Sequence, residues 1–122
     1  MKKAGWRQRA WRRAGMTTTD LSVQAHTVDG VTYMAVRGEL DAATTDAVRT
    51  VAQRAVYNSP FTELRIDLAG IASCDTFGLR VLIEIRELCT EHGIELVLER
   101  PAPCVLRVIG LAGLDVVFGT DS

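Results

Sequence analysis

The stretch DLAGIASCDTFGLRVL, residues 67–82, joins the end of a strand to the start of a helix. Just before and within it, Leu64, Ile66 and Leu68 alternate with charged residues, the period of a strand with one buried face. Further on, apolar residues recur at helical spacing, and Asp75 stands where an N-cap residue is expected. The stretch therefore predicts a strand over 64–68 and a helix that Asp75 opens.

Strands and helices alternate on both sides of this stretch. Upstream, two β-rich runs flank Asp29-Gly30 and predict a hairpin, which a helix ending at 58–60 follows. Downstream, His92-Gly93 closes the second helix, residues 94–98 predict a strand, and a third, short helix ends near 110–113. Residues 116–118 are expected to add a last short strand. The order ββαβαβα(β) predicts a single α/β domain, with helices packed on a small mixed sheet.

Charge divides the chain into two unequal parts. Residues 1–15 carry six basic residues and no acid, and they are expected to form a disordered extension outside a domain over 16–122. Trp6 and Trp11 leave open a second reading, an amphipathic arm for a membrane surface or RNA. The remainder has eight arginines against fifteen acidic residues, so we expect no direct contact with nucleic acid. No apolar run reaches the roughly 18 residues of a membrane span, so no membrane contact is expected of the domain.

Signatures of catalysis are missing from the sequence. It contains no G-x-S-x-G, no P-loop and no dinucleotide-binding glycine fingerprint. Its three cysteines form no C-x-x-C pair, and its two histidines stand far from any ligand set. Cys74 precedes a helix but has no basic partner, so it is expected to be a buried thiol. We therefore expect no catalytic residue, cofactor or metal, and a cytoplasmic protein with reduced thiols.

Thr76 is the one residue whose position suggests regulation. It would occupy the first turn of the helix that Asp75 caps, with its hydroxyl near solvent. Free amides and the helix dipole favour negative charge there. A phosphoryl group would add about −1.5 to −2 charges and leave the helix folded. The alternative on local chemistry is a plain capping segment.

Three motifs in order resemble the STAS domain of anti-sigma-factor antagonists. Residues 67–82 are similar to that family's D-L-S-G-V followed by D-S-S-G-L-x-x-L. Upstream, Gly38-Glu39-Leu40-Asp41 resembles the family's G-E-L/I-D after its second strand. Downstream, residues 106–118 resemble the ending V-x-x-x-L-x-x-x-G-L-D-x-x-F. The resemblance covers roughly residues 20–118 and implies a single STAS domain.

The resemblance also implies a mechanism. In that family the hydroxyl residue after the motif's Asp, here Thr76, is phosphorylated by the partner, an ATP-binding anti-sigma-factor serine/threonine kinase. The unphosphorylated antagonist binds this kinase and frees the sigma factor, and a serine/threonine phosphatase resets the switch. The residues expected to contact the partner are Asp41, Asp75, Thr76, Phe77, Gly78 and Arg80.

Two positions depart from the family's pattern. Phe77 replaces the second Ser of the motif, and Cys74 replaces a larger apolar residue. Phe77 bears on which partner is bound more than on the class of protein. Two other functions stay open: a STAS scaffold or accessory subunit of a stress-signalling or lipid-transport complex, with Thr76 silent, and a small enzyme or nucleotide-binding protein.

Overall fold

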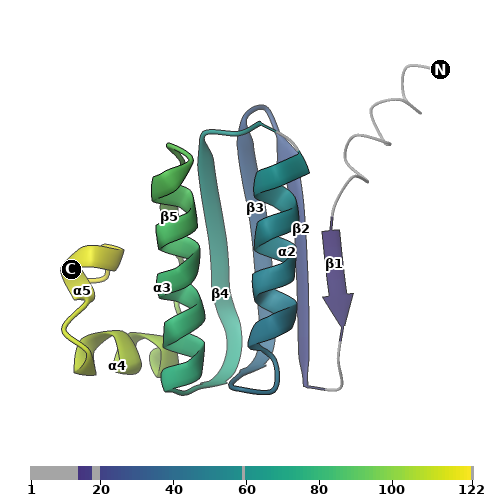
Figure 1. The fold of residues 1–122 in the computed structure, drawn as a ribbon. Coiled ribbons are helices and arrows are strands. Elements are labelled where there is room, and N and C mark those ends of the chain that lie inside the picture. Colours follow the sequence, from purple (N-terminus) through teal and green to yellow (C-terminus); the bar gives the residue numbers. More distant parts are fainter. Residues whose placement is uncertain (1–13, 18–19, 59, 122) are drawn as a thin grey trace.

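Five strands form one mixed sheet in this computed structural model, which describes residues 14–17, 20–58 and 60–121 (Figure 1). The strands lie side by side in chain order, antiparallel from the first to the third and parallel from the third to the fifth. They are β1 (Ala14–Thr17), β2 (Leu21–Val28), β3 (Val31–Leu40), β4 (Glu63–Cys74) and β5 (Glu95–Glu99). The helices are α2 (Thr45–Asn58), α3 (Thr76–Glu91), α4 (Pro103–Leu111) and α5 (Asp115–Phe118). The predicted α/β class with a mixed sheet is confirmed.

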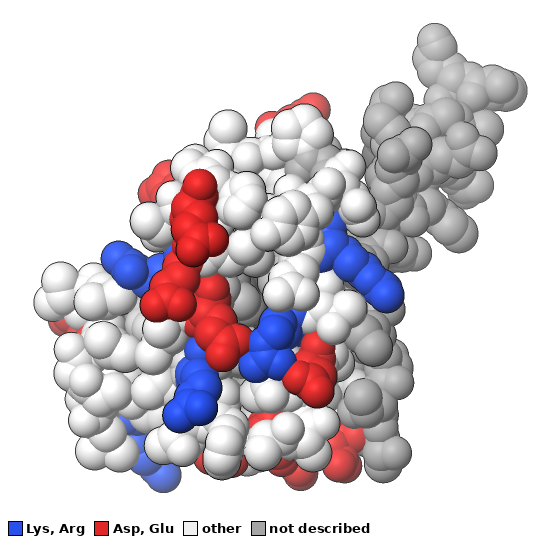
Figure 2. Space-filling view, in the orientation of Figure 1, with Lys and Arg blue, Asp and Glu red and all other residues white. Residues whose placement is uncertain are grey.

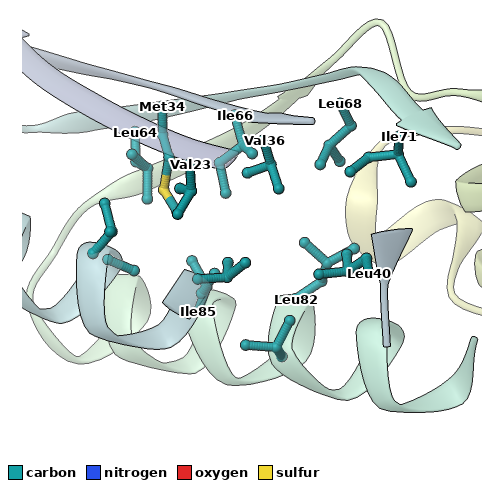
Figure 3. Packing of buried hydrophobic residues seen from close by; sticks show 14 of the residues in the cluster. Val23, Met34, Val36, Leu40, Leu64, Ile66, Leu68, Ile71, Leu82 and Ile85 are labelled. Atoms are coloured by element: carbon teal, nitrogen blue, oxygen red, sulfur yellow. The ribbon is translucent and has the colours of Figure 1, made fainter. Parts of the chain in front are cut away.

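The core lies between the sheet and the two long helices, α2 and α3, which cover the same face (Figure 1). Alternate side chains of β2, β3 and β4 point into it, as the period-two pattern predicts. In Figure 3 the labelled strand residues, among them Met34, Ile66 and Leu68, face Leu82 and Ile85 of α3. This packing holds α3 in one position relative to β4.

The β2–β3 hairpin turns at Asp29 and Gly30, as predicted. Both residues have positive φ angles, +51° and +80°. Two positive φ values are what a two-residue type I′ turn requires, and Asp-Gly is one of the pairs that adopt it. The opposite face of the sheet carries charged side chains, such as Arg65 in ion pairs with Glu63 and Glu99.

Three elements differ from the sequence-based expectation. β1 was not predicted, and it begins at Ala14, two residues before the expected start of the domain; the rest of the basic extension lies outside the described residues. β4 runs on to Cys74 instead of ending at residue 68, because its second half pairs with the second half of β3 across two register shifts. The expected strand over 116–118 is wrong. This segment lies in the helical turn α5, between Gly113 and Gly119 with left-handed backbones, and Phe118 is its buried anchor.

Parallel pairing of β3 and β4 positions the candidate site. Leu40 and Cys74, the last residues of the two strands, are partners in the register. Since parallel strands end at the same edge of a sheet, the loops that lead into α2 and α3 start beside each other. α4 packs against β4 near the same end, with the Sγ atom of Cys104 3.6 Å from the carbonyl oxygen of Ile71.

Candidate functional site

Asp75 caps α3, as predicted. Its Oδ1 atom accepts hydrogen bonds from the amides of Phe77, at 2.9 Å, and Gly78, at 3.1 Å. Its own backbone is extended, with φ −111° and ψ −168°, which is typical of an N-cap residue. The capping carboxylate therefore satisfies two of the amides that a helix leaves without partners in its first turn.

Thr76 is the first residue of α3, and it is exposed to solvent. The expectation that its hydroxyl lies near free amides needs correction, because the Phe77 and Gly78 amides already donate to Asp75. A group added to the hydroxyl would still meet the positive end of the α3 dipole. It would also meet the carboxylate of the preceding residue.

The loop that contains Asp41 lies beside the loop that contains Asp75. The amide of Asp75 donates to the carbonyl oxygen of Leu40 at 3.3 Å. Asp41 follows Leu40 directly, and its Oδ1 atom accepts from the Ala43 amide at 2.9 Å. The structure thus brings Asp41 to the same edge of the sheet as Thr76.

Two residues that the sequence analysis did not single out build this arrangement. Thr44 is buried, and its hydroxyl donates to the carbonyl oxygen of Glu39 at 2.7 Å while accepting from the Asp41 amide at 3.0 Å. Leu40 is buried against Gly78, whose position leaves no room for a side chain. The Gly38–Asp41 motif carried the only signal for Leu40, and no sequence pattern indicated Thr44.

Phe77 and Arg80 form an exposed pair on the first turns of α3. Phe77 is 49% exposed, and the guanidinium carbon of Arg80 lies 5.9 Å from the centroid of its ring. This is within the range of a cation–π contact. Of the six residues expected to contact a partner, Asp41 is half-buried and Gly78 buried, while the other four, Asp75, Thr76, Phe77 and Arg80, are exposed.

Cys74 lies in this site, and its surroundings disfavour the reactive thiolate. Burial raises the pKa of its thiol to about 12, and the neighbouring Cys104 and Asp75 add to the effect. Since the thiolate is the reactive form, Cys74 stays a protonated thiol near neutral pH. The expected buried thiol is thus half-buried in the structure.

The surface around α2 and α3 is acidic in part. Figure 2 shows acidic side chains gathered over α3. Glu84, Glu87 and Glu91 lie on this helix at spacings of three and four residues, which places them along one polar face. Arg49 of α2 forms ion pairs with Glu84, at 2.7 Å, and with Asp46.

Within residues 14–17, 20–58 and 60–121, no group of three potential ligands could hold a metal ion. In the same part of the chain, no helix has the length and apolar character needed to cross a bilayer.

The chain belongs to the STAS domain family, whose model matches residues 22–122. Among solved structures, an anti-sigma factor antagonist from Mycobacterium paratuberculosis is 30% identical to it, with a TM-score of 0.68; the match covers 84% of this chain and 87% of that one. RsbS from Moorella thermoacetica, solved as a variant, is 27% identical with a TM-score of 0.65, over 76% of this chain and 79% of that one. The chain is thus similar in structure to anti-sigma-factor antagonists.

A third relative shows likeness of fold alone. The Bacillus cell fate determinant SpoIIAA, in its phosphorylated form, is 18% identical with a TM-score of 0.63, over 77% of this chain and 86% of that one. None of the curated proteins compared with the chain matches it.

Proposed function

We propose that this protein is a cytoplasmic anti-sigma-factor antagonist that phosphorylation of Thr76 switches off. In the unphosphorylated form it binds an ATP-dependent anti-sigma-factor serine/threonine kinase, and the sigma factor is released for transcription. Membership of the STAS family and the 30% identity to an anti-sigma factor antagonist support this class of function. The observation that carries the switch is an exposed hydroxyl, that of Thr76, on the capped first turn of α3.

The proposed contact surface consists of the exposed and half-buried residues around Thr76. Asp41, Asp75, Phe77 and Arg80 surround it on two adjacent loops and one helical turn, and buried Gly78 allows the loops to approach. A phosphoryl group at its centre would change the charge of the surface without changing the core. Phosphorylation could therefore change partner binding while the fold stays the same.

The chemistry of the proposed switch is a simple transfer. The Oγ1 atom of Thr76 forms a bond to the γ-phosphorus of ATP, the bond from that phosphorus to the bridging oxygen breaks, and ADP leaves. The hydroxyl proton passes to a base of the kinase. A serine/threonine phosphatase reverses the modification with water, which restores the hydroxyl and releases inorganic phosphate.

The test is to incubate the protein with ATP and each ATP-binding anti-sigma kinase of the same genome. Trypsin cleavage after Arg65 and Arg80 releases residues 66–80, in which Ser73 and Thr76 are the two hydroxyl residues. Fragmentation of this peptide should place the phosphate on Thr76, and Thr76→Ala should abolish it while Ser73→Ala should not. If no kinase modifies Thr76, the switch is refuted and the non-switching scaffold becomes the better reading.

A further inference from the structure

Arg80 is placed to reach either Thr76 or Phe77. In an α-helix, residues three and four positions apart are neighbours, so Arg80 is next to Phe77 at i−3 and to Thr76 at i−4. Long side chains in helices point back toward the N-terminus, which directs the Arg80 guanidinium over the first turn. It lies over the Phe77 ring, 5.9 Å from the centroid.

The carboxylates nearest to Arg80 along α3 are already engaged. Glu84, its neighbour at i+4, binds the Nε atom of Arg49 at 2.7 Å. The Oδ1 atom of Asp75 accepts two amide hydrogen bonds in the cap. Over the described part of the chain, no ion pair holds Arg80.

A phosphate on Thr76 would find few free donors in the cap of α3. The Phe77 and Gly78 amides donate to Asp75 and would not be free to bind phosphate oxygens without loss of the cap. The Asp75 carboxylate adds a like charge beside the new group. The guanidinium of Arg80 is a planar donor that can bind a phosphate through two parallel hydrogen bonds.

We propose that Arg80 is the counter-ion of phosphorylated Thr76 and that Phe77 holds its guanidinium while Thr76 is unmodified. This inference rests on the proposed function and names the residues through which the phosphate acts. Phosphorylation draws the guanidinium from the aromatic ring to the phosphate. The surface then changes in two ways: it gains the phosphate, and the Phe77 ring is no longer covered by the Arg80 guanidinium. Phe77, the departure from the family's motif, thereby takes part in the switch.

The test uses full-length protein with phosphothreonine introduced at position 76 during translation, so that no kinase is needed. Phosphorus-31 NMR follows the second ionisation of the phosphate. A nearby arginine stabilises the dianion, so Arg80→Gln should raise the titration midpoint by about 0.2–0.4 pH unit, the equivalent of an exposed i,i+4 ion pair. Arg86→Gln, on the same helix and also exposed, is the matched control and should leave the midpoint unchanged.

A second signal reports on Phe77. In unmodified protein the Arg80 side-chain Nε–Hε resonance should shift when Phe77 is replaced in Phe77→Leu, because the ring current is lost. In the phosphorylated protein the same substitution should have a much smaller effect. Equal midpoints for the parent and Arg80→Gln would overturn the inference.

The two proposals can fail separately. Failure of every kinase to modify Thr76 refutes the proposed function, whereas the midpoint measured on encoded phosphothreonine does not depend on a kinase. Conversely, efficient phosphorylation by a kinase together with an unchanged midpoint in Arg80→Gln refutes only the role of Arg80.

Discussion

The amide nitrogen of Asp75 lies 3.3 Å from the carbonyl oxygen of Leu40, to which it donates a hydrogen bond. Leu40 ends β3, and Asp75 is the first residue after β4. The bond therefore joins the two loops that form the candidate site.

Gly78 should be required for the junction. A Cβ atom at this position would lie 2.7 Å from the Leu40 carbonyl oxygen and 2.9 Å from the Cys74 Sγ atom, and the backbone oxygen cannot move aside cheaply. Overpacking of this kind costs about 1–3 kcal/mol, which outweighs the helix preference of Ala over Gly, about 1 kcal/mol. Urea unfolding of Gly78→Ala should therefore show a lower free energy of unfolding than the parent.

The matched control for Gly78→Ala is Gly110→Ala. Gly110 is also helical, but its added Cβ would meet only the Asp115 carboxylate at an ordinary 3.6 Å. This variant should be as stable as the parent or slightly more so. Equal loss in both variants would contradict the role given to Gly78.

Removal of the Asp75 cap should destabilise α3. Asp75→Ala loses the acceptor for the Phe77 and Gly78 amides, and the loss of an N-cap costs about 1 kcal/mol. Asp75→Asn keeps a side-chain oxygen and should cost much less. Thermal melts followed by circular dichroism would compare the two, and an equal melting temperature for Asp75→Ala and the parent would count against the cap.

The start of the domain should coincide with β1. A chain that starts at Ala14 keeps all four paired positions with β2, whereas one that starts at Met16 loses the partners of Ala25 and Gln24. We expect the first chain to have the same melting temperature as the full-length protein, and the second to have a melting temperature a few degrees lower. If partner affinity falls more than tenfold in the first chain, about 1.4 kcal/mol, the basic segment is part of the interface.

Negative charge at Thr76 should affect recognition and leave the fold intact. Thr76 is exposed on α3, so Thr76→Glu should change the free energy of unfolding by less than about 1 kcal/mol. At the centre of an interface, an anion that the partner does not pair costs several kcal/mol, and about 8 kcal/mol is the whole of a micromolar affinity. Thr76→Glu should therefore lose the kinase in a pull-down.

Thr76→Ala should bind the kinase whether or not ATP is present. Thr90→Ala, an exposed threonine at the other end of α3, is the matched control and should behave like the parent. A Thr76→Glu variant that binds as tightly as the parent would refute the switch.

Asp41 should contribute to partner binding through its charge. Asp41→Asn keeps an oxygen for the Ala43 amide and removes the charge, whereas Asp41→Lys also reverses the charge and breaks that hydrogen bond. Calorimetric titration with the kinase should show weaker binding in both variants, more so for Lys. If both variants bind the kinase with the affinity of the parent, the interface does not include this loop.

Local patterns in the sequence were enough to predict much of the fold. The alternation at Leu64, Ile66 and Leu68, the Asp29-Gly30 turn and the Asp75 cap depend on neighbours within a few residues, and all three are present. The position of Thr76 in the first turn of α3 could be predicted in the same way, because it directly follows the capping residue. These features are encoded locally because strand period, turn conformation and capping involve only adjacent backbone.

Contacts between segments far apart in the chain determined the rest. β1 and the second half of β4 exist because a neighbouring strand supplies their hydrogen bonds. The segment at 116–118 pairs with no strand among the described residues. The Arg80 guanidinium lies over the Phe77 ring, while Glu84, its neighbour at i+4, binds Arg49, which stands thirty-five residues earlier in the chain. Such choices depend on which partners tertiary packing brings together, and no local pattern in the chain specifies that.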